Sequence, residues 1–348
     1  MADTRLIFAS AAAVLVASAA MAADEPALLA EARQVFQPLP KQLSTAEATL
    51  GNERIKLGRM LFFDPRLTVD GNVSCATCHQ PALYGADGLS KSIGVQQRPH
   101  PRNAPTVLNS GLNTIVHWRG DRDSLEDQAS KALQSPITNG LPDIAAALDR
   151  LKRIPGYASL FKAAFPGDAA PLNVGNVANA ISAYERTLLT PAPFDAYLVG
   201  DADALSPSAR RGLASFISIG CSACHNGVGI GGSIYQKFGI VEDYWTATGS
   251  QTIDKGRADV TKDPADLYVF RAPSLRNVAM TAPYFHDGSV SMLSDAVRIM
   301  ARVQLGSKLS DPEVNDIVAF LESLTGELPP AFATAPILTP AAVTAGQH

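Results

Sequence analysis

The sequence predicts a mainly α-helical protein built from two related halves. Segments that carry apolar residues at helical spacing alternate with stretches rich in proline and glycine, and strand patterns are sparse. One order of features also occurs twice, an amphipathic segment followed by the pattern C-x-x-C-H, first at 75–79 and again at 221–225. At 348 residues the chain is longer than one hydrophobic core usually serves, which favours two domains.

The N-terminal residues 1–22 are predicted to be a signal peptide. Arg5 supplies a positive charge, an apolar run rich in alanine follows, and AMA at 20–22 has the small-x-small pattern of a cleavage site. The mature chain is therefore expected to start near Ala23 and to be periplasmic. No later segment has the roughly 18 uninterrupted apolar residues that a membrane-spanning helix needs, so no membrane span is expected.

The overall charge argues against nucleic acid as a partner. The formal net charge is −4, and no run of lysine and arginine occurs in the chain. Proteins that bind nucleic acid usually carry a basic patch or stripe. The charge is too small to indicate an acidic or a basic protein partner.

The four cysteines all fall in the two motifs CATCH (75–79) and CSACH (221–225). Disulfides or a four-sulfur zinc site would leave each adjacent histidine without a role, and a redox dithiol needs only one such motif. C-x-x-C-H is the attachment sequence of c-type haem, in which the thiols add to the haem vinyl groups and the histidine binds the iron. Two covalent haems are therefore predicted, attached by Cys75, Cys78, Cys221 and Cys224, with His79 and His225 as proximal iron ligands.

These motifs make the predicted halves two cytochrome c-like haem domains, related by a loose internal duplication. The first domain is expected over 23–190, starting with a lead-in at 23–40. A loop rich in glycine and proline at 81–105 is typical of chain wrapped around a cofactor. Amphipathic patterns with proline or glycine stops predict its helices at 55–67, 124–133, 143–154 and 174–189.

The proline-rich stretch 191–195 is the predicted boundary, and the second haem domain is expected over 191–326. Helical patterns cover 206–218 and 311–324. The tail 327–348 is rich in proline and alanine and is predicted to be disordered.

Three methionines are candidates for a soft axial ligand opposite a proximal histidine. Met280, Met292 and Met300 all follow the second haem motif, and a haem held by His and Met is a common electron-transfer form. A methionine on an amphipathic helix is also a common filler of a hydrophobic core. Spacing alone does not choose among the three.

The order of motifs resembles that of the bacterial di-haem cytochrome c peroxidases and the related MauG-like di-haem oxidases. The resemblance covers roughly residues 55–326. It is carried by LGRMLFFDPRLT, SCATCH, PRNAPTVLN, WRG, LEDQA, CSACH, FRAPSLRNVAMTAPYFHDGSV and MARVQLG.

The resemblance implies different roles for the two haems. The first would react with peroxide, and the second, with Met300 opposite His225, would receive electrons. Trp118 would relay electrons between them, and Met280 and Met292 would then be core residues. A calcium ion is implied at Asn103 and the backbone carbonyls of Thr281 and Pro283, since oxygen ligands suit a hard cation. His286 would have a structural or hydrogen-bonding role near the second haem.

Two departures from the family pattern concern the first haem. Many members have a histidine that caps the oxidised iron where this chain has Val95, which cannot bind iron. His100 is the nearest substitute, but the prolines on both sides restrict its backbone. The resemblance therefore predicts an open iron that needs no prior reduction.

The second departure is Thr138, at the place of the family's catalytic glutamate. A carboxylate can move the proton that peroxide cleavage requires, whereas threonine cannot at neutral pH. Gln128 could orient peroxide, and His117 is an alternative base. Glu126 and Asp127 are expected to be solvated helix residues.

The leading hypothesis is a periplasmic peroxidase that reduces hydrogen peroxide to water, with electrons from a small c-type cytochrome or a cupredoxin. One alternative is a MauG-like oxidase that modifies a Trp or Tyr of a partner protein. Another is a di-haem electron-transfer cytochrome without enzymatic activity. Members of the family are often dimeric, so the resemblance also implies a homodimer.

Overall fold

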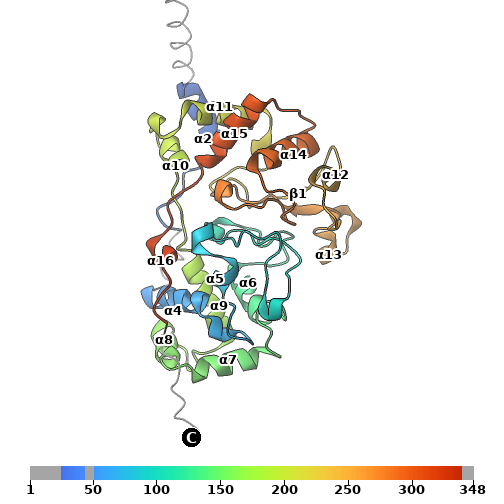
Figure 1. Cartoon of the computed structure of the whole chain (residues 1–348). Helices are drawn as coiled ribbons and strands as arrows, with labels where there is room; N and C mark the ends of the chain where they lie inside the picture. The colour runs from blue at the N-terminus through green and yellow to red at the C-terminus, as the bar shows by residue number, and fades with distance from the viewer. Residues whose placement is uncertain (1–24, 44–50, 339–348) are drawn as a thin grey trace, which may run out of the picture.

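The computed structural model describes residues 25–43 and 51–338 and is mainly helical (Figure 1). Its one sheet is a two-stranded antiparallel ribbon, in which β1 (Tyr235–Lys237) pairs with β2 (Val269–Arg271). The predicted signal peptide lies outside the described residues. Within the described ranges, no helix is long and apolar enough to cross a bilayer.

One hydrophobic core lies among helices of the first half. Every helix predicted there is confirmed, with ends shifted by a few residues. Three of these helices begin where the side chain of Ser124, Asp143 or Asn173 accepts a hydrogen bond from a backbone N–H of the first turn. The helices of this region are α4 (Asn52–Phe63), α5 (Cys75–Cys78), α6 (Leu125–Leu133), α7 (Ile144–Arg153), α8 (Tyr157–Ala164) and α9 (Val174–Glu185).

A second hydrophobic core lies among helices of the second half, and both helices predicted there are confirmed. The last long helix starts with a capping box between Ser310 and Glu313, which satisfies backbone N–H groups at its first turn. The helices are α10 (Pro193–Leu198), α11 (Pro207–Ser218), α12 (Tyr244–Thr248), α13 (Ala258–Thr261), α14 (Leu293–Leu305) and α15 (Asp311–Glu322).

The two cores share one packing detail, a glycine four residues before a phenylalanine. Gly58 of α4 lies so close to α9 that a Cβ atom would come 1.8 Å from the carbonyl oxygen of Ala180, and Gly212 of α11 has the same clearance from α15. One turn later, the rings of Phe62 and Phe216 each lie 6.5 Å from the histidine of a C-x-x-C-H motif. In both regions, therefore, a close helix crossing positions an aromatic ring against that histidine.

The first and last segments that the structure describes, 25–36 and 327–338, pack on different cores. Helix α2 (Glu25–Val35), predicted as a lead-in to the first domain, lies against α10 and α11 (Figure 1), and Phe36 after it is buried in the second core.

At the other end, residues 327–338 fall in the predicted disordered tail but include helix α16 (Pro330–Ala333). Phe332 is buried in the first core, 6.2 Å from the ring of Phe62, and Arg59 donates a hydrogen bond to the carbonyl of Ala331. Apolar anchors in an otherwise proline- and alanine-rich segment therefore order it. The rest of the predicted tail, 339–348, lies outside the described residues.

Candidate functional site

The first C-x-x-C-H motif lines a cavity of about 390 Å³, a volume typical of cofactor sites. Cys75, Cys78 and His79 form one side of it. The remaining walls come mainly from the 100–119 loop, helix α6 and the segment that follows α6.

The imidazole of His79 is fixed by its own loop. Its Nδ1 lies 2.9 Å from the carbonyl oxygen of Gly85, which can only accept a hydrogen bond, so Nδ1 carries the proton. Burial lowers the pKa of His79, although the bond to Gly85 acts in the opposite direction. The result is a neutral imidazole whose Nε2 lone pair is free to bind a metal.

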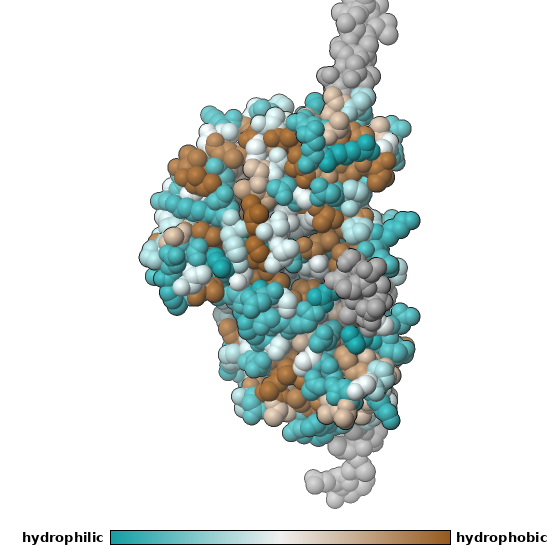
Figure 2. Space-filling view, turned by 180° about the vertical axis from the view of Figure 1, so that it is seen from behind, coloured by the Kyte–Doolittle hydropathy of each residue, from teal (hydrophilic) through white to brown (hydrophobic). Residues whose placement is uncertain are grey.

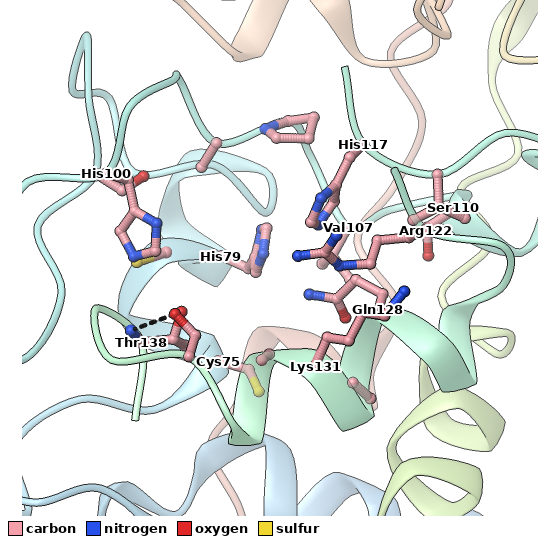
Figure 3. Close-up of a pocket in the computed structure, with 18 of the residues that line it drawn as sticks. Cys75, His79, His100, Val107, Ser110, His117, Arg122, Gln128, Lys131 and Thr138 are labelled. Carbon is pink, nitrogen blue, oxygen red and sulfur yellow. Dashed lines mark hydrogen bonds between the residues drawn. The ribbon is translucent and has the colours of Figure 1, made fainter. Parts of the chain in front are cut away.

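Polar side chains from separate segments surround the space beside His79, as Figure 3 shows. Gln128 comes from α6, His117 and His100 from the loops before it, and Thr138 from the turn after it. Thr138 is held there because its backbone N–H donates a 3.1 Å hydrogen bond to Ser135 Oγ. The structure therefore brings together all the residues that the sequence suggested for this side of the first site.

Val95 does not line the cavity. Its side chain is fully buried, and its backbone N–H donates a 2.9 Å hydrogen bond to the carbonyl of Ile137. His100 does line the cavity, and burial lowers its pKa, so its imidazole is largely neutral at neutral pH.

His117 is paired with an acid. Its Nδ1 lies 3.4 Å from one carboxylate oxygen of Asp121, and the other carboxylate oxygen accepts a 2.7 Å hydrogen bond from Arg122. Burial acts to raise the pKa of Asp121, but the bonds to His117 and the nearby arginines outweigh it, so the pKa falls well below its usual range. An ionised Asp121 can therefore orient the His117 ring.

The second motif lines a separate cavity of about 380 Å³ with Cys221, Cys224 and His225. Nδ1 of His225 lies 3.1 Å from the carbonyl oxygen of Pro273, and burial lowers the pKa of His225 to about 4. Gly231 allows this contact, since its φ is +110° and a Cβ there would lie 2.4 Å from the same carbonyl oxygen. The second histidine is thus also neutral, with Nε2 free.

Met300 is the methionine that lines the second cavity. Met280 and Met292 are absent from its described lining, and they are 46% and 59% exposed. The expectation that these two are core residues is therefore wrong, because Met280 sits in a surface turn and Met292 just before α14.

Trp118 lines both cavities, and its Nε1 donates a 2.9 Å hydrogen bond to the carbonyl of Asn103. Asn103 lines both cavities as well, with Thr281 and Pro283 in the wall of the second. The side-chain nitrogen of Asn103 donates a hydrogen bond to the carbonyl of Leu89, which leaves its side-chain oxygen available to a cation.

His286 is buried beside the second cavity, where its ring stacks on that of Phe270 with the ring centroids 4.3 Å apart.

One acid, Glu126, differs from its expected solvated state, whereas Asp127 forms only an exposed pair within its own helix. Glu126 forms a bidentate ion pair with Arg186 of the turn after α9, and Asp127 pairs with Lys131 at 2.8 Å. The Glu126–Arg186 pair fastens helix α6, which carries Gln128, to the turn after α9, whereas the Asp127–Lys131 pair lies within α6. Two further residues line the first cavity, Glu185 and Arg271, and no sequence motif marks them because each becomes distinctive only through burial.

Both cavities fit a covalently attached haem. Each has two cysteines beside a histidine whose Nε2 is free, and burial raises the pKa of Cys75 to about 12 and of Cys221 to about 11, unlike the reactive thiols of a redox dithiol. The two cysteine pairs line different cavities, and the described residues hold no group of three or more His, Cys, Asp or Glu arranged for a metal ion. This arrangement counts against a shared four-sulfur zinc site.

Known proteins resemble this chain along most of its length. Residues 52–203 match the family described as di-haem cytochrome c peroxidase. The cytochrome c551 peroxidase of Pseudomonas aeruginosa is 43% identical over 319 residues, or 91% of each chain. The methylamine utilization protein MauG of Methylorubrum extorquens is 37% identical and covers 82% of this chain and 81% of its own. The crystal structure of a MauG-like protein associated with microbial copper homeostasis superposes with a TM-score of 0.74 at 30% identity, covering 85% of this chain and 95% of that one.

Proposed function

The chain belongs to the di-haem cytochrome c peroxidase family, and on that premise we propose that it reduces hydrogen peroxide to water in the periplasm. It is an oxidoreductase of the peroxidase type and carries two c-type haems. In the proposed reaction, hydrogen peroxide, two electrons and two protons give two water molecules.

The observation that carries this proposal is the asymmetry of the first cavity. His79 supplies a free Nε2 on one side, while Gln128, His117 and Thr138 supply polar groups around the same space. Val95 is buried and is not among the residues that line it. These features support a site that admits peroxide in the oxidised protein, without a protein side chain at position 95 to displace.

When bound, each haem supplies an iron centre that exchanges electrons, and at an open position it can react with peroxide. Cys75 and Cys78 would attach the first haem and Cys221 and Cys224 the second. His79, His225 and Met300 would be the iron ligands.

The side chains around the first site have distinct proposed roles. Gln128 would orient peroxide by hydrogen bonding. The His117–Asp121 pair would hold and move a proton, because an ionised carboxylate behind an imidazole stabilises its protonated form. Thr138 can hydrogen-bond but cannot replace a carboxylate in proton transfer.

Electrons would enter at the second site from a small redox protein. Ile240 and Leu305 line the second cavity and are themselves 54% and 38% exposed, so an apolar surface lies beside that site. On the face shown in Figure 2, apolar residues form small patches separated by hydrophilic ones. Trp118, which lines both cavities, would relay electrons between the sites.

A calcium ion would sit beside this tryptophan. The free side-chain oxygen of Asn103, with the carbonyls of Thr281 and Pro283 in the same cavity wall, supports an oxygen-only site. The shared glycine–phenylalanine detail at Gly58 and Gly212 likewise supports an internal duplication of the two haem regions.

The test is steady-state consumption of peroxide with a reduced small c-type cytochrome, started from the fully oxidised protein. We expect turnover without a lag and without prior reduction. A low-temperature EPR spectrum of the oxidised protein should show a high-spin first haem, and a bis-histidine low-spin signal would contradict the open site. No reaction with peroxide would contradict the peroxidase proposal itself.

A second candidate function is a MauG-like oxidation of a Trp or Tyr on a partner protein. Thr138 in place of a carboxylate and the similarity to a MauG protein favour it. Met300 in the second cavity favours the peroxidase, because a His/Met site accepts electrons readily. Slow peroxide turnover together with a modified residue in a partner protein would favour the oxidase.

A further inference from the structure

The wall between the two cavities contains a buried guanidinium group. Arg271 lines both cavities and is 4% exposed. It sits in strand β2, and its backbone N–H donates a 2.8 Å hydrogen bond to the carbonyl of Trp118. A cation therefore lies beside the tryptophan that separates the two candidate haem sites.

The charge of Arg271 is not balanced by the protein. Its Nε donates a 3.1 Å hydrogen bond to the carbonyl of His117, but its Nη1 has no hydrogen-bond partner. None of the ion pairs found among the described residues involves it. Burial lowers its pKa to about 10, which still leaves it protonated at neutral pH. A buried guanidinium with an unpaired donor is unfavourable unless an anion pairs with it.

Arg276, five residues later in the same segment, shows how this fold satisfies a buried arginine. It is 1% exposed, and its two terminal nitrogens donate to the two carboxylate oxygens of Asp195 at 2.9 and 2.8 Å. The chain thus supplies a carboxylate to this buried guanidinium, although Arg276 also lines the second cavity. No such carboxylate meets Arg271, although it is nearly as buried.

The cavity linings offer no other counterion. The residues that line the second cavity include Lys237, Arg271 and Arg276 but neither aspartate nor glutamate. In the first cavity, Asp64 is bound to Arg66 and Asp121 to Arg122. The third acid there, Glu185, has a pKa that burial raises to about 8, so it is mainly uncharged at neutral pH. The anion must therefore come with the group that fills the cavities.

We propose that Arg271 is a shared counterion for the propionate carboxylates of both haems and sets the reduction potentials of both sites together. The inference rests on the proposed placement of one haem in each cavity. The planar guanidinium can donate from two edges, and Arg271 borders both cavities, so it can bind a carboxylate on each side.

This assignment has two physical consequences. A positive charge near an iron disfavours the oxidised state, because that state carries more positive charge, so removal of Arg271 lowers the potential. A propionate that loses its arginine also becomes easier to protonate. Its titration then makes the potential depend on pH near neutrality.

The experiment is a spectroelectrochemical titration of both haems in the holoprotein, for Arg271→Gln, Arg271→Lys and the native protein at several pH values. In Arg271→Gln we expect the reduction equilibrium constant of each haem to fall about tenfold, which is 59 mV for a one-electron couple. Arg271→Lys keeps the charge and should stay close to native. Arg211→Gln removes an arginine that lies outside both cavity linings and should leave the reduction potentials of both haems unchanged.

Unchanged potentials with a native pH dependence in Arg271→Gln would overturn the proposal, and a shift confined to one haem would overturn the shared role. If Arg271→Gln does not retain both haems, Arg271→Lys carries the test. In Arg271→Lys, the resonance Raman bands of the propionates should shift at both haems, because a single ammonium group replaces a guanidinium that can donate from two edges. Propionate bands that do not shift would refute the assignment. Peroxide turnover is measured in a separate assay. The reduction potentials therefore test the role of Arg271 even if the protein proves not to be a peroxidase.

Discussion

The cavities at His79 and at His225 have matching proximal sides and different opposite walls. In both, a carbonyl oxygen fixes Nδ1 of the histidine, and a phenylalanine ring lies 6.5 Å away. The first cavity faces Gln128, His117 and Thr138, whereas the second faces Met300 and mainly apolar residues. The attachment motif therefore fixes where each haem lies, and under the proposed function the opposite walls would give the two haems different roles.

The largest expected effect comes from exchanging the soft ligand of the second site. Met300→His should lower the potential of the second haem by a sizeable part of the about 0.8 V range that axial ligands span, because imidazole favours the oxidised iron more than a thioether does. A spectroelectrochemical titration measures the change. Met292→His, at an exposed position outside the second cavity, is the control and should leave both haems unchanged. An unaltered second haem in Met300→His would remove Met300 from the ligand set.

Phe332, in the segment 327–338, is buried in the first core, and its loss should destabilise the first core more than the second. Phe332→Ala is expected to cost about 3–5 kcal/mol of unfolding free energy, the usual cost of removing a buried phenylalanine. Denaturant titration, followed at the absorbance of each haem, measures it. Ile337→Ala, at a position 98% exposed in the same segment, should cost less than about 0.5 kcal/mol. Equal stabilities for the two variants would mean that the end of the chain does not stabilise the first core.

A catalytic difference between the two walls can be tested at Gln128. Gln128→Leu should lower kcat/KM for peroxide by on the order of 10²-fold, the usual effect of removing one well-placed hydrogen-bond donor. The potential of the second haem should not move. Gln134→Leu, just after the same helix and outside the cavity lining, serves as the matched variant. Peroxide kinetics like those of the native protein in Gln128→Leu would exclude Gln128 from the reaction.

An effect that depends on pH concerns Glu185, a buried acid that lines the first cavity. Burial raises its pKa to about 8, with Arg186 lowering it and Glu126 raising it. Since this pKa lies above the unfolded value, the stability linked to it is complete at acidic pH and is lost as pH rises from about 4 to 8, by at most about 1.4 kcal/mol per pH unit.

Glu185→Gln should therefore lose less stability than the native protein between pH 5 and pH 8, as measured by denaturant titration at both pH values. Glu322→Gln, at an exposed position at the end of α15, should keep the native pH dependence. The same pH dependence in Glu185→Gln and the native protein would show that Glu185 ionises normally.

Local patterns in the sequence determined the helices, the two attachment motifs and the family. Helix α6, for example, follows from apolar residues at helical spacing and from Ser124, whose side chain caps the first turn. The motif Cys-x-x-Cys-His identifies its ligand because the relevant atoms are adjacent in the chain. The resemblance to the family also marks Val95 and Thr138 as departures, because many members have a histidine and a glutamate at these two places.

Only the tertiary structure decided which distant residues meet. It placed Phe36 in the second core and Phe332 in the first, left Met280 and Met292 exposed, and brought Arg271 to the wall between the cavities without a carboxylate. None of these outcomes follows from spacing along the chain, because burial and charge balance depend on contacts between segments far apart in sequence. The sequence thus names the cofactor through adjacent residues, while the fold assigns the two sites their different chemistry through distant ones.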